Sequence, residues 1–145
     1  MIKSFRGVLA DGGQDRIRLS TKDGLTGYKV VKFQTMSVSP GLEQHESVTQ
    51  IFKNKIESVP TASATINFSN PLLIAANAYI AGNASAEIYN QQVIFDDVKV
   101  NQDIYVTHTE NDGTSSINYY IELEQVKLNL NEATVATLKD MRGRE

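Results

Sequence analysis

The sequence predicts an all-β domain, an antiparallel β-sandwich of about eight strands with two short helices. Two observations support this class. Several segments alternate apolar and polar residues with the period of two that a half-buried strand requires. Little of the remaining chain could form the helical crossovers that join parallel strands. A jelly roll is one form of such a sandwich, and the runner-up is a single curled sheet wrapped around one helix.

The clearest strands fall in the last third of the chain. Residues 93–100, 103–108 and 117–123 each alternate and are rich in β-branched and aromatic side chains. Asp112 and Gly113 between the last two segments are typical of a hairpin tip, since such a turn needs positive φ. These two strands are therefore expected to pair as a β-hairpin.

The register of the last strand can be read from its alternation. One face carries four apolar residues, namely Ile117, Tyr119, Ile121 and Leu123. The apolar set then changes parity and continues at Val126 and Leu128. A β-bulge near Glu124 or Gln125 would keep both sets pointing at one core.

The earlier chain is expected to supply further strands and the two helices. Strands are predicted over residues 2–10, 16–19, 28–38, 48–56 and 62–68. The first helix is expected over residues 71–81, because Asn70 can cap it and proline suits the first helical position. The second is expected over residues 131–141, with Val135, Leu138 and Met141 spaced along one face.

The composition fits one soluble domain. The chain has 145 residues, 41% hydrophobic and 21% charged, and no cysteine that could form a disulfide or a thiolate metal site. A net charge of −3 and scattered basic residues argue against a nucleic-acid partner. No signal peptide is recognisable, which predicts synthesis in the cytoplasm. The longest apolar stretch is too short to span a membrane.

No motif predicts catalysis, a cofactor or a metal site. Asp96, Asp97 and Asp103 suggest calcium, but their spacing is not that of an EF-hand loop. His108 stands close to acidic residues, yet no nucleophile elbow accompanies it, and a surface or cross-strand histidine with its hydrogen bonds satisfied explains it better. His45 falls in a polar loop. We therefore expect a protein that is not an enzyme.

Candidate contact residues come from one strand face and from the chain ends. The polar face of the last strand carries Asn118, Tyr120 and Glu122, and tyrosine combines apolar area with a polar group. The terminal candidates are Ile2, Phe5, Arg142 and Arg144. These residues are expected to contact partner subunits.

The chain resembles a group of small proteins encoded by marine bacteriophages. The resemblance rests on residues 11–34 (DGGQDRIRLSTKDGLTGYKVVKFQ), 95–108 (FDDVKVNQDIYVTH), 118–128 (NYYIELEQVKL) and 131–142 (NEATVATLKDMR). It is weakest between residues 37 and 90. What the resemblance implies is a place in the virion, and it brings no catalytic residues.

The expected function is that of a virion structural protein that decorates or cements the capsid. Its partners would be the shell protein and copies of itself, since such proteins act through many repeated contacts. Two alternatives remain open. One is a tail, spike or fibre-base component, and the other is a host receptor-binding module that uses the loops at residues 42–46 and 110–116.

Overall fold

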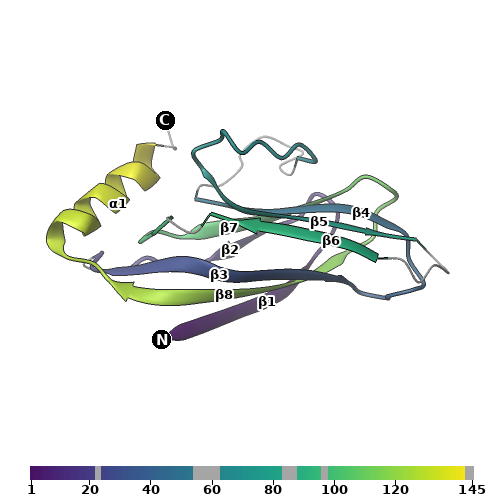
Figure 1. The fold of residues 1–145 in the computed structure, drawn as a ribbon, viewed down its shortest axis with the longest axis horizontal. Coiled ribbons are helices and arrows are strands. Elements are labelled where there is room, and N and C mark those ends of the chain that lie inside the picture. Colours follow the sequence, from purple (N-terminus) through teal and green to yellow (C-terminus); the bar gives the residue numbers. More distant parts are fainter. Residues whose placement is uncertain (22–23, 54–62, 83–87, 96–97, 143–145) are drawn as a thin grey trace.

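The computed structural model describes residues 1–21, 24–53, 63–82, 88–95 and 98–142, which contain eight strands and one helix. The strands form two antiparallel sheets, β1-β8-β3 and β2-β7-β4-β5-β6, which stack face to face (Figure 1). The predicted antiparallel sandwich is thus confirmed. The elements are β1 (Ile2–Leu9), β2 (Gln14–Ile17), β3 (Thr26–Ser37), β4 (His45–Phe52), β5 (Leu73–Ala81), β6 (Ile88–Ile94), β7 (Ile104–Glu110), β8 (Ile117–Lys127) and α1 (Leu130–Arg142).

The strand order is that of a jelly roll with one seam left open. In a jelly roll the first half of the chain winds antiparallel to the second half, so that β1, β2, β3 and β4 lie beside β8, β7, β6 and β5. Three of these four pairings are hydrogen-bonded here, and β6 pairs only with β5. The β3–β6 seam is bridged by a side chain, because Asn90 Nδ2 donates to the Thr35 carbonyl at 3.2 Å.

The hydrophobic core lies between the two sheets. The four β8 residues predicted to share the inner face are all buried, which confirms that register. Facing them are residues of the larger sheet, among them Ile51, Ile74, Ile104 and Val106. Burial of each such side chain contributes about 1.5–3 kcal/mol.

The predicted hairpin between the last two long strands is wrong. β7 and β8 lie in different sheets and do not pair with each other. The turn itself has the expected conformation, since Gly113 has φ +84°. Both strands bury one face in the same core from opposite sides, and strands that paired within one sheet could not do so. Residues 111–116 therefore carry the chain from one sheet to the other.

The predicted bulge near Glu124 or Gln125 is wrong, because both residues keep a regular register with β3, and a bulge lies in β3 instead. The register of β3 against β8 shifts between Val30 and Lys32, so Val31 is the extra residue. Before it Tyr28 and Val30 are buried, and after it Phe33 is buried, so the bulge keeps the apolar residues of β3 inside. The parity change in β8 has another cause. Val126 and Leu128 belong to a second small cluster beneath α1.

The predicted helix over residues 71–81 is wrong, and this segment forms β5. β5 is a central strand between β4 and β6, and nearly all of its residues are buried. Residues 63–68, predicted as a strand, form no regular element. The side chain of Gln50 binds this segment, since Nε2 donates to the carbonyls of Ser63 at 3.0 Å and Thr65 at 3.3 Å. The helix prediction was wrong because β5 is buried on both faces, and such a strand lacks the apolar–polar alternation that distinguishes a strand from a helix in the sequence.

Only one of the two predicted helices is present among the described residues. α1 begins at an Asn129 cap, whose Oδ1 accepts the Glu132 N–H at 2.8 Å. It lies across one end of the sandwich (Figure 1) and buries Ala133 and Ala136 there. The predicted face was wrong, because Val135 and Leu138 are exposed.

Two further predictions need correction. The strand expected over residues 93–100 is interrupted, because β6 ends at Ile94 and Val100 makes only an isolated bridge to Tyr28. The strand expected over residues 48–56 is β4, which ends at Phe52, and residues 54–56 lie outside the described part. No helix in the described residues is long and apolar enough to span a bilayer.

Candidate functional site

The outer face of the sheet β1-β8-β3 is the first candidate site. Its residues alternate with the core residues, and the strand registers place them in rows across the three strands. One row brings Val8 and Met36 to either side of Asn118. The next row brings Arg6 and Gln34 to either side of Tyr120, and the third brings Ser4 and Lys32 to either side of Glu122.

A groove of about 710 Å³ lies on the first two rows. Its lining includes two exposed apolar side chains, an arginine, two tyrosines and four amides. The outer-face residues are Arg6, Val8, Gln34, Met36, Asn118 and Tyr120, and Asn90 and Gln92 of β6 also line the groove. Val8 is 56% exposed and Met36 is 59% exposed. The groove thus offers apolar contact area beside hydrogen-bonding groups, which is typical of a protein interface.

The polar end of this face is internally paired. The Tyr120 hydroxyl donates to Glu122 Oε2 at 2.7 Å, and this hydrogen bond raises the pKa of Tyr120. Lys32 Nζ lies 4.0 Å from Glu122 Oε2, and Lys29 Nζ lies 3.9 Å from Glu124 Oε2. Such exposed pairs stabilise the fold by less than about 1 kcal/mol. The hydrogen bond to Glu122 holds the Tyr120 hydroxyl on this face.

A second tyrosine supports the groove from the core side. Gly7 and Thr35 pair with Tyr119 from the two neighbouring strands. A Cβ on Gly7 would lie 2.8 Å from the Tyr119 ring, so the ring requires a glycine beside it. Its hydroxyl donates to Asp15 Oδ2 of the other sheet at 2.7 Å. Burial, together with this bond, raises the pKa of Tyr119.

The predicted contact residues are placed as follows. Asn118, Tyr120 and Glu122 share the outer face, as their alternation indicates, and Ile2 is exposed at the start of β1. Phe5 is half-buried and packs against the core. Arg142 is the last residue of α1, and its side chain and Arg144 lie outside the described residues. The groove itself was not predicted, because it needs residues from four strands.

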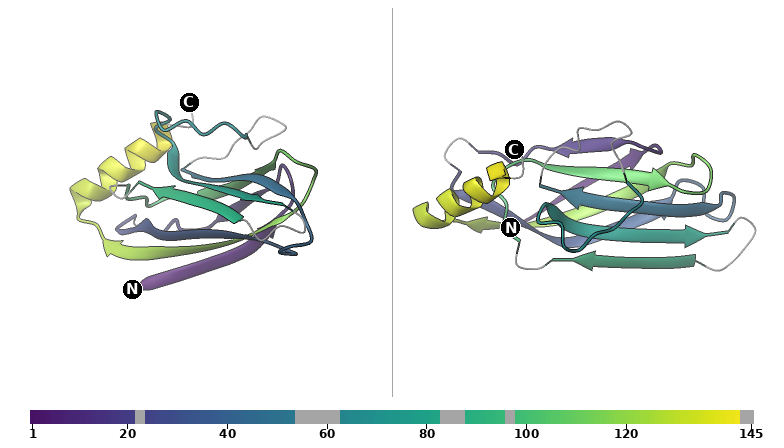
Figure 2. Two further views of the ribbon diagram at one scale, coloured as in Figure 1. Left: turned by 45° about the vertical axis from the view of Figure 1, so that its right-hand side comes forward. Right: turned by 90° about the horizontal axis from the view of Figure 1, so that it is seen from above.

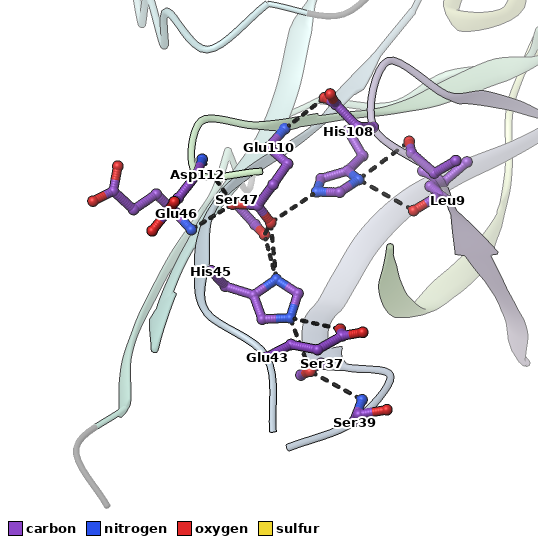
Figure 3. Close-up of polar contacts among 12 residues, drawn as sticks. Leu9, Ser37, Ser39, Glu43, His45, Glu46, Ser47, His108, Glu110 and Asp112 are labelled. Atoms are coloured by element: carbon purple, nitrogen blue, oxygen red, sulfur yellow. Dashed lines mark hydrogen bonds and ion pairs between the residues drawn. The ribbon is translucent and has the colours of Figure 1, made fainter. Parts of the chain in front are cut away.

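A buried polar network is the second candidate site (Figure 3). Glu110 lies at its centre. Its Oε1 accepts hydrogen bonds from Ser47 Oγ at 2.6 Å and from His45 Nδ1 at 2.8 Å. Its Oε2 accepts the backbone N–H of Glu46 at 2.5 Å and that of Asp112 at 3.4 Å. His45 is fully buried in β4, so the prediction of a loop position was wrong.

Both histidines bind groups of the smaller sheet through a ring nitrogen. His45 donates from Nδ1 to Glu110, and its Nε2 lies 2.8 Å from Ser37 Oγ and 3.5 Å from Glu43 Oε2. His108 donates from Nδ1 to the carbonyls of Leu9 at 3.1 Å and Ala10 at 3.3 Å. Burial lowers the pKa of His108, which keeps its Nε2 unprotonated. Because Leu9 and Ser37 belong to the smaller sheet, both histidines tie the two sheets together.

The order Ser37, His45 and Glu110 resembles a hydrolytic triad, since a hydroxyl, an imidazole and a carboxylate follow one another in hydrogen-bond reach. Burial argues against that role. Ser37 is 2% exposed and His45 is 0% exposed, so a substrate could not reach the hydroxyl in this conformation. The Ser37 hydroxyl oxygen is also occupied by the Ser39 N–H at 3.0 Å. The network is better explained as a polar tie between the sheets.

Asp103, considered above as a calcium ligand, is held by the protein itself. It accepts the backbone N–H groups of Leu19 at 2.8 Å and Ser20 at 3.0 Å and a charged hydrogen bond from Arg16 at 2.7 Å. Burial alone would raise the pKa of Asp103, but these bonds outweigh it and lower the pKa to about 2. No group of metal-ligating side chains occurs among the described residues, and Asp96 and Asp97 lie outside them.

Asp103→Asn is expected to lower the free energy of unfolding by about 2 kcal/mol at pH 7, because charged hydrogen bonds are lost. A carboxyl with a depressed folded pKa stabilises the fold above its unfolded pKa and loses this effect as pH falls towards 2. Urea unfolding at pH 7 and pH 3 measures this. The variant should lose less stability than the wild type between these pH values, with exposed Glu46→Gln as control. An equal loss in both would show that Asp103 is not the titrating group.

Comparison with known proteins gives no family. No protein-family model and no curated protein matches the chain. A solved structure described as "Bacillus endospore appendages form a novel family of disulfide-linked pili" aligns with 88% of this chain and 89% of its own, at 11% identity and a TM-score of 0.31. A TM-score this low does not establish a common fold.

Proposed function

We propose that this chain is a non-enzymatic structural protein of a bacteriophage virion that decorates or cements the capsid shell. The observation that carries the proposal is the outer face of β1-β8-β3, where exposed Val8 and Met36 flank a groove beside Tyr120. Aromatic residues and methionine are enriched at the centres of protein interfaces. The phage resemblance of the sequence supports the choice of partner. The protein would be made in the host cytoplasm and act in the virion.

The buried histidine network supports a structural role over a catalytic one. It places three ionisable groups between the sheets with nearly all of their polar atoms paired within the protein. Such an arrangement stabilises one packing of the sheets, which a virion protein needs in order to present a fixed surface. A second reading, a tail, spike or receptor-binding component, would instead use loops such as that of Leu42, which is 81% exposed.

Tyr120→Ala is expected to weaken binding to purified capsid shells by about tenfold or more, because a central interface tyrosine contributes well over 1 kcal/mol. Co-sedimentation of the protein with shells, at a series of protein concentrations, measures this. Leu42→Ala is the matched control, since it removes an exposed apolar side chain from a loop. Wild-type protein that ignores shells but binds host cells, with Leu42→Ala abolishing that binding, would replace the decoration proposal with the receptor-binding one.

A further inference from the structure

β6 is an unprotected edge of the larger sheet. It is the last strand in the order β2-β7-β4-β5-β6 (Figure 2). β3 of the smaller sheet lies across the seam, where Asn90 Nδ2 donates to the Thr35 carbonyl at 3.2 Å, but among the described residues β6 forms a backbone ladder only with β5. Edge strands are usually protected by charged side chains that prevent pairing with another chain. β6, with the sequence IYNQQVI, has none. The other three edges each have two, namely Lys3 and Arg6 of β1, Asp15 and Arg16 of β2, and Lys29 and Lys32 of β3.

The backbone groups that β6 offers can be assigned from its register. Phe95, one residue beyond the strand, donates its N–H to the Ile74 carbonyl of β5 at 3.0 Å. In an antiparallel pair this direction alternates, so every second residue points its backbone groups at β5 and the others point away. Ile88, Asn90, Gln92 and Ile94 therefore direct their N–H and C=O groups to the open edge.

The sequence of β6 is nearly symmetric about Gln91. If a second copy of β6 lies antiparallel with Gln91 opposite Gln91, Ile88 meets Ile94 and Tyr89 meets Val93 of the other copy. Asn90 meets Gln92, so the amides also face each other. This register pairs outward-pointing residues with outward-pointing residues, as an antiparallel ladder requires. Apolar and aromatic pairs of this kind each contribute about 0.2–1 kcal/mol.

We propose that two copies of this chain associate through β6, antiparallel and centred on Gln91, so that their larger sheets become one continuous sheet. The interface is isologous, as expected for a twofold dimer, because the same strand serves both copies. About eight main-chain hydrogen bonds would form along the seven residues. Asn90 and Gln92 also line the groove, so the dimer places the two grooves next to each other. This inference does not depend on the proposed shell contact.

Charges at the symmetry axis test the register directly. Gln91→Lys places two ammonium groups opposite each other, and Gln91→Glu places two carboxylates there, so each variant alone is expected to weaken dimerisation at least tenfold. An equimolar mixture of the two variants is expected to form the dimer again, because opposite charges then meet. Sedimentation velocity over a range of protein concentrations measures the three cases. Asn111→Lys and Asn111→Glu, in an exposed loop, are the matched controls.

Each outcome of the sedimentation experiments either supports or overturns the β6 dimer. A wild-type dimer, two monomeric Gln91 variants, a dimeric mixture and unaffected Asn111 controls would support the proposal. The proposal would be overturned by a wild type that stays monomeric at every soluble concentration, or by a dimer that survives both substitutions. A mixture that stays monomeric would overturn the pairing at Gln91. Circular dichroism of each variant checks that the fold is intact before the comparison is made.

Discussion

Glu110→Ala is expected to lower the free energy of unfolding by about 3–5 kcal/mol, because it removes the centre of a buried hydrogen-bonded network. The carboxylate accepts from Ser47 Oγ, His45 Nδ1 and the Glu46 N–H, at 2.6, 2.8 and 2.5 Å. All three donors would lose this acceptor. Ser47 Oγ and His45 Nδ1 lie 3.1 Å apart and could pair with each other, which leaves at least one buried donor unpaired, and each such group costs about 1–3 kcal/mol. Urea unfolding followed by circular dichroism at pH 7 measures the loss.

Glu124→Ala is the matched control, since it removes the same side chain from an exposed pair. Lys29 Nζ lies 3.9 Å from Glu124 Oε2 on the outer face, and the loss there should stay below about 1 kcal/mol. The loss in free energy of unfolding for Glu110→Gln should lie between those of Glu110→Ala and Glu124→Ala. The amide oxygen still accepts hydrogen bonds, whereas the NH₂ group faces other donors and cannot accept from them. A cost of Glu110→Ala no larger than that of Glu124→Ala would show that the network does not stabilise the fold.

The location of the network explains why its loss should affect the whole fold. Each histidine is on the larger sheet and forms hydrogen bonds with the smaller one, His45 with Ser37 and His108 with the carbonyl of Leu9. Hydrogen bonds from Tyr119 to Asp15 and from Asn90 to Thr35 also join the sheets, while the apolar contacts of the core are not directional. A directional tie at one end of the sandwich therefore fixes how the sheets are aligned, and with it the shape of the outer groove.

The sequence predicts where the strands lie far better than which strands pair with each other. Alternation from Ile117 to Leu123 identifies both β8 and its buried face, since the side-chain period is a local property. Which strand lies next to β8 depends on contacts with β1 and β3, distant in the sequence, and the hairpin turn at Gly113 suggested the wrong neighbour. The helix prediction for residues 73–81 was wrong for a related reason. A short apolar run fits a buried helix or a central strand equally well.

The candidate site could be predicted only in part. Tyr120 and its neighbours on β8 were found because one strand carries them all. The groove also requires Val8, Met36 and the amides of β6, and no local pattern joins these residues. His45 was missed because it stands beside polar residues in the sequence, although the fold buries it. Histidine and glutamate inside a predicted β-sandwich were the only available signal.

Deletion of Val31 is expected to lower the free energy of unfolding by about 3–6 kcal/mol, because it removes the β3 bulge. Val31 is the extra residue that lets Tyr28 and Val30 on one side and Phe33 on the other all point into the core. Without it, one half of β3 must turn over, since a shift of one residue moves every side chain to the other face. If the first half turns, Tyr28 and Val30 become exposed, each at a cost of about 1.5–3 kcal/mol.

Val31→Ala distinguishes the effect of losing the extra residue from the effect of losing its side chain. Val31 is 38% exposed, so its truncation should change the free energy of unfolding by less than about 1 kcal/mol while keeping the bulge. A deletion no more costly than this substitution would mean that β3 tolerates a regular register. A costly deletion would show that the length of β3, and not only its pattern of apolar residues, aligns it on β8. The row of Gln34, Tyr120 and Arg6 lies beyond the bulge, so the same residue count sets the outer face.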